Sequence, residues 1–189
     1  MIASMSFRTV LSIAPITGDH ITLRRPTVAD VGAIAEYLRD DGADEWLSGS
    51  DSASVLYAEY SAGWDRPDLP NRLGLTLVIG CSNDDRLVGV MHLEPDGGVL
   101  HVSFGVAPDH RRRGVASEAL TLCSAWALAQ GFTRVELEIG EDNVASQAVA
   151  RRCGFAPTSR TRSQLLPDGE LWHARAWCLR AERGPHKQI

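Results

Sequence analysis

Apolar and polar residues alternate in several short segments of the chain, which is the pattern of β-strands. Residues 21–25 form the first such segment, and order is expected to begin at Ile21 because residues 1–20 are only weakly patterned. Three apolar runs then follow one another, at residues 73–81, 87–93 and 99–106. Since the connections between them are short and rich in Asn, Asp and Gly, they predict an antiparallel meander.

Helical spacing accounts for much of the remaining chain. Thr27 and Asp30 have the spacing of a capping box, which marks the start of a helix. The expected apolar face of that helix carries Val31, Ile34 and Leu38.

Three further helices are expected, from about Ser52, from Val115 to the stop at Gly131, and from Asn143 to Gly154. A strand over residues 133–139 separates the last two, and two final strands flank the turn at 167–169. This order predicts one α/β domain, with a mixed but mostly antiparallel sheet flanked by about four helices.

Composition limits the classes of partner. The chain has 189 residues, enough for one domain to bury a core without disulfides or a metal. With 19 Lys and Arg against 24 Asp and Glu, its formal net charge is -5, so attraction to a polyanion must come from a local basic cluster. No stretch approaches the roughly 20 apolar residues of a membrane span, and the start lacks the pattern of a secretory signal. We therefore expect a cytoplasmic protein without a membrane or nucleic-acid partner.

The four cysteines stand far apart in the chain, with no C-x-x-C pair and no histidine at ligand spacing. We expect all four to be buried apolar thiols, and we expect no metal site. They are Cys81, Cys123, Cys153 and Cys178.

One window, from Val102 to Ala116, combines a strand, a tight loop and a helix start. It contains the basic cluster 110–113, of sequence His-Arg-Arg-Arg, followed by Gly114. Backbone N–H groups at a helix start form a site for a phosphate or pyrophosphate, and glycine permits close approach. Arginines at this end of a helix oppose its dipole, which favours an anionic ligand over a merely solvated patch. The loop has the spacing of neither a P-loop nor a dinucleotide-binding motif.

This loop resembles that of the GCN5-related N-acetyltransferase (GNAT) family, whose acyl-CoA loop reads Gln/Arg-x-x-Gly-x-Gly/Ala. Arg111, Gly114 and Ala116 stand at the defining positions. Matching blocks follow at residues 143–146, Asn-Val-Ala-Ser, and at residues 153–155, Cys-Gly-Phe. The Asn-x-x-Ser form, the Leu-Arg-Arg-Pro-Thr opening and the late Asp-Gly turn look most like the RimJ/RimL-like branch, which acetylates the N-termini of ribosomal proteins.

The resemblance implies an N-acetyltransferase domain over residues 21–180, an N-terminal tail or edge segment over 1–20 and a C-terminal tail over 181–189. It implies acetyl-CoA as the acyl donor, with the pyrophosphate on the loop and the pantetheine arm along a strand that splays from its neighbour. It implies no metal. The implied cofactor-binding residues are Phe104, Gly105, Val106, Arg111, Arg112, Arg113, Gly114, Val115, Ala116, Asn143 and Ser146.

Acetyl transfer from a thioester to an amine requires a neutral amine, stabilisation of an oxyanion and a proton for the departing thiolate. A strand N–H near Val106 is the expected oxyanion donor. Many family members protonate the thiolate with a tyrosine four residues before the last helix glycine, a position that Ala150 occupies here. Ser146 is therefore the candidate acid.

Candidate bases and acceptor contacts are less sharply defined. Glu94 is the first candidate for the general base and Glu138 the second, while His92 and His101 stay open because histidine titrates near neutrality. Four tryptophans are candidates for lining an acceptor pocket. They are Trp46, Trp64, Trp172 and Trp177.

The expected acceptor is a primary amine, and the branch resemblance favours a protein or peptide N-terminal amine. A small amine such as an antibiotic or a polyamine stays open, because clustered acids precede the second expected helix. These are Asp40, Asp41, Asp44 and Glu45. A non-catalytic acyl-CoA-binding module also stays open, and a homodimer is compatible with the resemblance.

Overall fold

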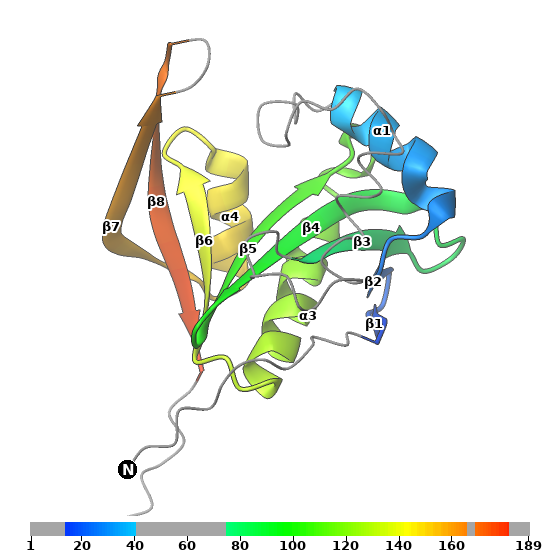
Figure 1. Ribbon diagram of the computed structural model, residues 1–189, viewed down its shortest axis with the longest axis horizontal. Helices are drawn as coiled ribbons and strands as arrows, with labels where there is room; N and C mark the ends of the chain where they lie inside the picture. The colour runs from blue at the N-terminus through cyan, green and yellow to red at the C-terminus, as the bar shows by residue number, and fades with distance from the viewer. Residues whose placement is uncertain (1–13, 41–74, 166–168, 182–189) are drawn as a thin grey trace, which may run out of the picture.

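The computed structural model describes residues 14–40, 75–165 and 169–181 (Figure 1). They form one sheet of eight strands in the order β1-β2-β3-β4-β5-β6-β8-β7. Neighbouring strands are antiparallel except β5 and β6, which run parallel. The strands are β1 (Ile16–Thr17), β2 (Ile21–Arg24), β3 (Leu75–Cys81), β4 (Leu87–Asp96), β5 (Val99–Val106), β6 (Arg134–Gly140), β7 (Ala156–Leu165) and β8 (Leu171–Arg180).

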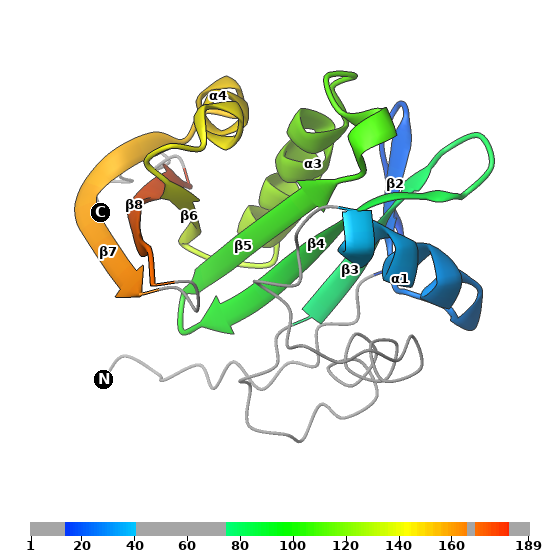
Figure 2. The same ribbon diagram turned by 90° about the horizontal axis from the view of Figure 1, so that it is seen from above.

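Helices lie on both faces of this sheet. Helices α3 and α4 cover one face, and α1 lies against the other (Figure 2). The described helices are η1 (Val28–Asp30), α1 (Val31–Asp40), η3 (Pro108–His110), α3 (Val115–Ala129) and α4 (Val144–Arg152), of which η1 and η3 are 3-10 helices. The expected mixed α/β sheet is confirmed. Three of the expected helices are present, and the one predicted from about Ser52 lies outside the described residues.

The predicted meander is confirmed, since β3, β4 and β5 pair in sequence order. The expectation that order begins at Ile21 is wrong, because Ile16 and Thr17 already pair with Leu23 and Thr22 as strand β1. Two residues are too short a run to show alternation, so the strand could not be recognised from its own pattern.

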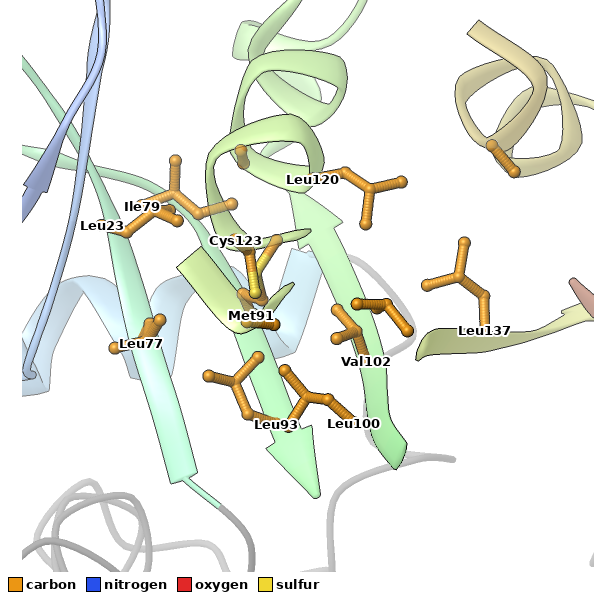
Figure 3. Close-up of a cluster of buried hydrophobic side chains, with 14 of the residues drawn as sticks. Leu23, Leu77, Ile79, Met91, Leu93, Leu100, Val102, Leu120, Cys123 and Leu137 are labelled. Atoms are coloured by element: carbon orange, nitrogen blue, oxygen red, sulfur yellow. The ribbon is translucent and has the colours of Figure 1, made fainter. Parts of the chain in front are cut away.

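The main core lies between α3 and the sheet. Figure 3 shows side chains of β3, β4 and β5, including Met91, Leu93 and Val102, gathered beneath Leu120 and Cys123 of α3. Burial raises the pKa of the Cys123 thiol to about 12, so that sulfur is an inert packing group. The expectation for the cysteines holds for Cys123 and Cys178, which are buried, but is wrong for Cys81 and Cys153, which are only partly buried.

The opposite face of the sheet has a different character, and we call it the polar face. Since side chains alternate along a strand, the residues between the core positions of β4, β5 and β6 all lie on it. At one end Val90 packs against Ile34 and Tyr37 of α1. Away from α1 it is lined by polar and charged side chains, namely Thr76, His92, Glu94, His101, Ser103, Glu136 and Glu138.

An ion-pair network fixes the chain at the start of α1. The Arg24 guanidinium donates from Nη1 and Nη2 to the two oxygens of Asp30, each at 2.8 Å, and from Nε to Asp85 at 2.7 Å. Asp30 also accepts from the Thr27 N–H at 2.7 Å and from the Thr27 hydroxyl at 2.8 Å, which confirms the capping box. Burial opposes the charge of Asp30, but the hydrogen bonds from Arg24 and Thr27 outweigh it and lower the pKa of the carboxyl.

Candidate acyl-CoA site

The loop between β5 and α3 has the backbone of an anion-binding site. Arg112 has φ 61° and Gly114 has φ 88°, so two residues adopt the left-handed conformation within three positions. The first hydrogen bond of α3 runs from the Glu118 N–H to the Gly114 carbonyl, so the N–H groups of Val115, Ala116 and Ser117 have no partner inside the helix. A loop in which left-handed and right-handed backbone conformations alternate turns its N–H groups toward one point. The N-terminus of a helix does the same, and an anion binds at such a point.

Arg111 has a structural contact that its place in the basic cluster did not suggest. Its Nε donates to the Val106 carbonyl at 2.9 Å, which ties the loop to the last residue of β5. Arg112 and Arg113 are exposed, and they add positive charge at the helix start. The sequence does not distinguish the three arginines. In the structure Arg111 stabilises the conformation of the loop, while Arg112 and Arg113 make no such contact in the described residues.

Strands β5 and β6 separate before β5 reaches this loop. Their parallel pairing covers only three positions and ends at His101 and Glu136, after which the strands diverge (Figures 1 and 2). Strand β6 continues to Gly140 paired only with β8. Within the described chain, the edge of β5 from Val102 to Val106 is therefore left without a partner strand.

The register of β5 shows which backbone groups line this open edge. The Ala107 N–H donates to the Val88 carbonyl of β4, so odd-numbered residues of β5 direct their backbone groups toward β4. Even-numbered residues direct theirs the other way. The backbone groups of Val102, Phe104 and Val106 thus face the gap between β5 and β6. The Val106 carbonyl accepts from Arg111, and the Val102 N–H belongs to the last paired position with Glu136. An extended amide-containing chain can therefore pair with the remaining groups, above all those of Phe104.

Helix α4 begins at the far side of this gap. Asn143 is its N-cap and accepts from the Ser146 N–H at 2.9 Å, as the sequence predicted. The side chain of Gln147 donates to the carbonyls of Gly140 and Glu141 and so fixes the helix to the end of β6. Ser146 is half-buried, and its hydroxyl makes no hydrogen bond within the described residues. Ala150, at the position of the family tyrosine, is fully buried and offers no hydroxyl.

The three carboxylates on the polar face have unequal surroundings. Glu94 is exposed near the end of β4. Glu138 is bound by Arg162 at 3.2 Å and by Arg160 at 3.6 Å, and both arginines reach across from β7. Because both carboxylate oxygens are occupied by guanidinium groups, this contact disfavours Glu138 as a proton acceptor.

Glu136, which the sequence did not single out, lies where β5 and β6 separate. Only 8% of it is exposed, and it binds Arg134 at 2.8 Å and Arg160, with His101 at 3.9 Å. Burial opposes its charge, but the hydrogen bond from Arg134 and the charge of Arg160 outweigh that effect and lower the pKa. The alternation of charged residues along β6 is the one sequence signal that could have pointed to it.

His92, one of the two histidines left open as a base, forms a pair with Thr76 that the sequence did not predict. Thr76 Oγ1 and His92 Nδ1 lie 3.1 Å apart across β3 and β4. Burial lowers the pKa of His92, and the charge of Glu94 only partly opposes this. The imidazole is therefore neutral at pH 7.

The tryptophans divide between two environments. The expectation that Trp177 lines an acceptor pocket is wrong, because it lies on the α4 face of β8 and is 2% exposed, with the Arg151 guanidinium 4.9 Å from its ring. Trp172 is half-buried against Gly140, near the wide end of the gap. The other residues proposed for the acceptor side, Trp46, Trp64, Asp41, Asp44 and Glu45, and the side chain of Asp40, lie outside the described residues.

A small pocket of about 200 Å³ lies between α1, the start of β4 and η3. Glu36, Tyr37 and His110 are among the residues that line it. In the described ranges no three His, Cys, Asp or Glu side chains gather as metal ligands would. No helix among the described residues is both long and apolar enough to cross a bilayer.

Comparison with known proteins agrees with this geometry. The acetyltransferase (GNAT) domain model matches residues 20–156, and the chain belongs to this family. A curated relative, the mycothiol acetyltransferase of Clavibacter sepedonicus, is 30% identical over 130 residues, which cover 65% of this chain and 42% of that protein. The chain thus spans less than half the length of this relative.

Solved structures share the fold. The ribosomal-protein-S5-alanine acetyltransferase of Vibrio fischeri superposes with a TM-score of 0.74 at 14% identity, over 90% of this chain and 98% of that one. The microcin C7 self-immunity acetyltransferase, solved with acetyl-CoA and AMP, gives a TM-score of 0.72 at 15% identity, over 87% and 94% of the two chains. At these identities the likeness shows the fold alone.

Proposed function

We propose that this protein transfers an acetyl group from acetyl-CoA to a primary amine, with a protein or peptide N-terminal amine as the acceptor. One observation carries the donor: the open edge of β5 leads directly into the anion-binding loop before α3. A long ligand with a pyrophosphate at one end and amides along its arm fits both features together. Family membership supports the same donor.

The pyrophosphate binds to the loop backbone between Arg112 and Ala116, with the charge of Arg112 and Arg113 beside it. The pantetheine arm pairs with the even-numbered residues of β5 as an added strand would. Phe104 and Gly105 are half-buried beside this path, and Asn143 and Ser146 border it from α4.

The length of the arm refines the position of the reaction. From the pyrophosphate to sulfur the arm is as long as about four residues of extended chain. If the arm starts beside Val106 and runs back along β5, its length brings the thioester beside Val102, close to the point where β5 and β6 separate. The Phe104 N–H is then a better oxyanion donor than the Val106 N–H that the sequence suggested.

Ser146 stays the candidate acid for the thiolate, since it is half-buried in the first turn of α4, the helix that follows the end of β6. Glu94 and Glu138 stay candidate bases, and Glu94 is favoured because no arginine binds it within the described residues. A cytoplasmic location and a homodimer also stay predictions from the sequence.

Two kinds of acceptor amine are compatible with this site, a peptide N-terminal amine and a small-molecule amine. The ribosomal-protein branch resemblance favours a peptide amine, while the name of the curated relative, mycothiol acetyltransferase, favours a small-molecule amine. Thiol release from acetyl-CoA should therefore be measured with a panel of N-terminal peptides and a panel of small amines and polyamines.

Donor binding is tested first, by thermal unfolding with acetyl-CoA, CoA and CoA lacking the 3'-phosphate. A ligand at 100 times its dissociation constant adds about 2.7 kcal/mol to the free energy of unfolding. Stabilisation with turnover on an amine supports the enzyme. Stabilisation without turnover on either panel supports a non-catalytic acyl-CoA-binding module, and no stabilisation at millimolar concentration contradicts the donor site.

A further inference from the structure

The Thr76 and His92 pair lies in a position that the candidate site leaves unused. Thr76 is 6% exposed, and its hydroxyl oxygen is 3.1 Å from His92 Nδ1. His92 stands directly opposite Ser103 of β5 on the polar face. Ser103 lies between Val102 and Phe104, whose backbone groups face the gap.

The orientation of the imidazole follows from this contact. Nδ1 is turned toward β3, so Nε2, on the other side of the ring, is turned away from β3. Nε2 makes no hydrogen bond within the described residues. Neighbouring strands are about 4.8 Å apart, so a ligand along the open edge of β5 lies two strand spacings from β4, and the ring reaches an acceptor amine there through one water above Ser103. The exposed, small side chain of Ser103 does not block that path.

We propose that His92 Nε2 takes the proton from the acceptor ammonium, and that Thr76 is the positioning residue that holds the ring by accepting from Nδ1–H. This assignment rests on the proposed acetyltransferase function. It assigns the proton to His92 in place of the two candidate carboxylates, Glu94, which is exposed, and Glu138, which arginines bind.

The protons balance in three transfers. The ammonium gives one proton to Nε2, and the freed lone pair attacks the thioester carbonyl carbon. The C–N bond forms, the C–S bond breaks, and the sulfur leaves as a thiolate that receives the second proton of the amine by way of the Ser146 hydroxyl. The imidazolium then returns its proton to water, so the products are an amide, the free thiol and one proton.

The tautomer is the critical requirement. If Nδ1 carries the hydrogen, Thr76 accepts it and Nε2 has a free lone pair. If Nε2 carries the hydrogen, Thr76 donates to Nδ1 and the ring cannot act as a base at Nε2. The charged or titratable described groups nearest the ring are Glu94 on its own strand and His101 on β5, which in turn contacts Glu136 of β6.

The first experiment is ¹⁵N NMR of the histidines in the full chain at pH 7, with His92→Gln used for assignment. We expect His92 to be neutral with the hydrogen on Nδ1, and Thr76→Val to shift this tautomer equilibrium. An Nε2–H tautomer overturns the assignment whether or not the protein is active.

The second experiment is the pH profile of kcat/KM. We expect His92→Gln to lower kcat about 100-fold and to remove the decline of kcat/KM at acidic pH. Thr76→Val should lower kcat about tenfold with KM for acetyl-CoA unchanged, and Thr76→Ser should restore it, since it keeps the hydroxyl.

The chain offers a matched control in the exposed pair of Ser163 Oγ and His173 Nδ1, 2.8 Å apart on β7 and β8. Ser163→Ala removes the same kind of contact away from β5 and should leave kcat unchanged. Turnover of His92→Gln within about twofold of wild type contradicts the role of His92. If acetyl-CoA fails to stabilise the wild-type protein, the acetyltransferase function is contradicted instead, and the NMR result still decides the tautomer.

Discussion

Asp30 is expected to contribute more to stability than its small size suggests. It accepts four hydrogen bonds, two from the Arg24 guanidinium and two from Thr27, and it is 5% exposed. Replacing it with Asn keeps the shape but removes the charge and leaves the Arg24 donors with a poor acceptor. A hydrogen bond to a charged group contributes about 1.5–3 kcal/mol. Since Arg24 keeps its contact with Asp85, we expect Asp30→Asn to cost about 2 kcal/mol at pH 7.

The pH dependence gives the sign of the effect. The folded-state pKa of Asp30 is lower than its ordinary value of 3.8, so its stabilising effect is present above that value. The effect is lost as the pH falls through the folded-state pKa, because both states are then protonated. Urea unfolding of wild type and Asp30→Asn should therefore differ by about 2 kcal/mol at pH 7 and progressively less as the pH falls from about 4 toward 2.

Asp85→Asn is the matched control, because it removes the other carboxylate that binds Arg24. Asp85 is exposed and has φ 55°, a conformation that Asn also adopts readily. The loss at this exposed pair should be under about 1 kcal/mol. The reasoning is refuted if Asp30→Asn equals wild type at pH 7, or if the difference between them is unchanged at low pH.

Three further changes test the loop, the acid and the core. Gly114→Ala should lower the free energy of unfolding by about 1 kcal/mol and weaken acetyl-CoA binding in a titration. Gly131→Ala is the control, because Gly131 has φ 95° and equally open space around its Cβ position; it should cost the same stability and leave acetyl-CoA binding unchanged. Ser146→Ala should lower kcat at least tenfold with unchanged acetyl-CoA affinity; unchanged turnover removes Ser146 as the acid. Leu100→Ala, in the fully buried core, should cost about 2–5 kcal/mol by urea unfolding, while Leu165→Ala, 68% exposed, should change stability by less than about 0.5 kcal/mol.

Local patterns predicted most of the elements. The meander, the capping box at Thr27 and the N-cap at Asn143 depend on residues a few positions apart, and all three are confirmed. Short-range chemistry of this kind is complete in the sequence itself.

Burial on a helix was less predictable. Of the expected face of α1, Ile34 is buried and Val31 only partly buried, while the side chain of Leu38 lies outside the described residues; Tyr37, which the pattern did not select, is buried. Spacing identifies a face to within one residue, and the sheet surface below then selects the side chains that fit. The misplacement of Trp177 has the same cause, since a residue's position in a strand does not tell which face a helix will cover.

The sequence by itself determined the loop chemistry, the strands and the resemblance that names the donor. Only the tertiary structure decided which groups meet. Arg160 and Arg162 of β7 bind Glu136 and Glu138 of β6 across the intervening strand β8, and Thr76 meets His92 across two strands. The separation of β5 from β6, on which the site depends, is likewise set by the packing of whole elements. Such contacts join residues far apart in the chain, and outside the meander no local pattern records which strand will lie beside which.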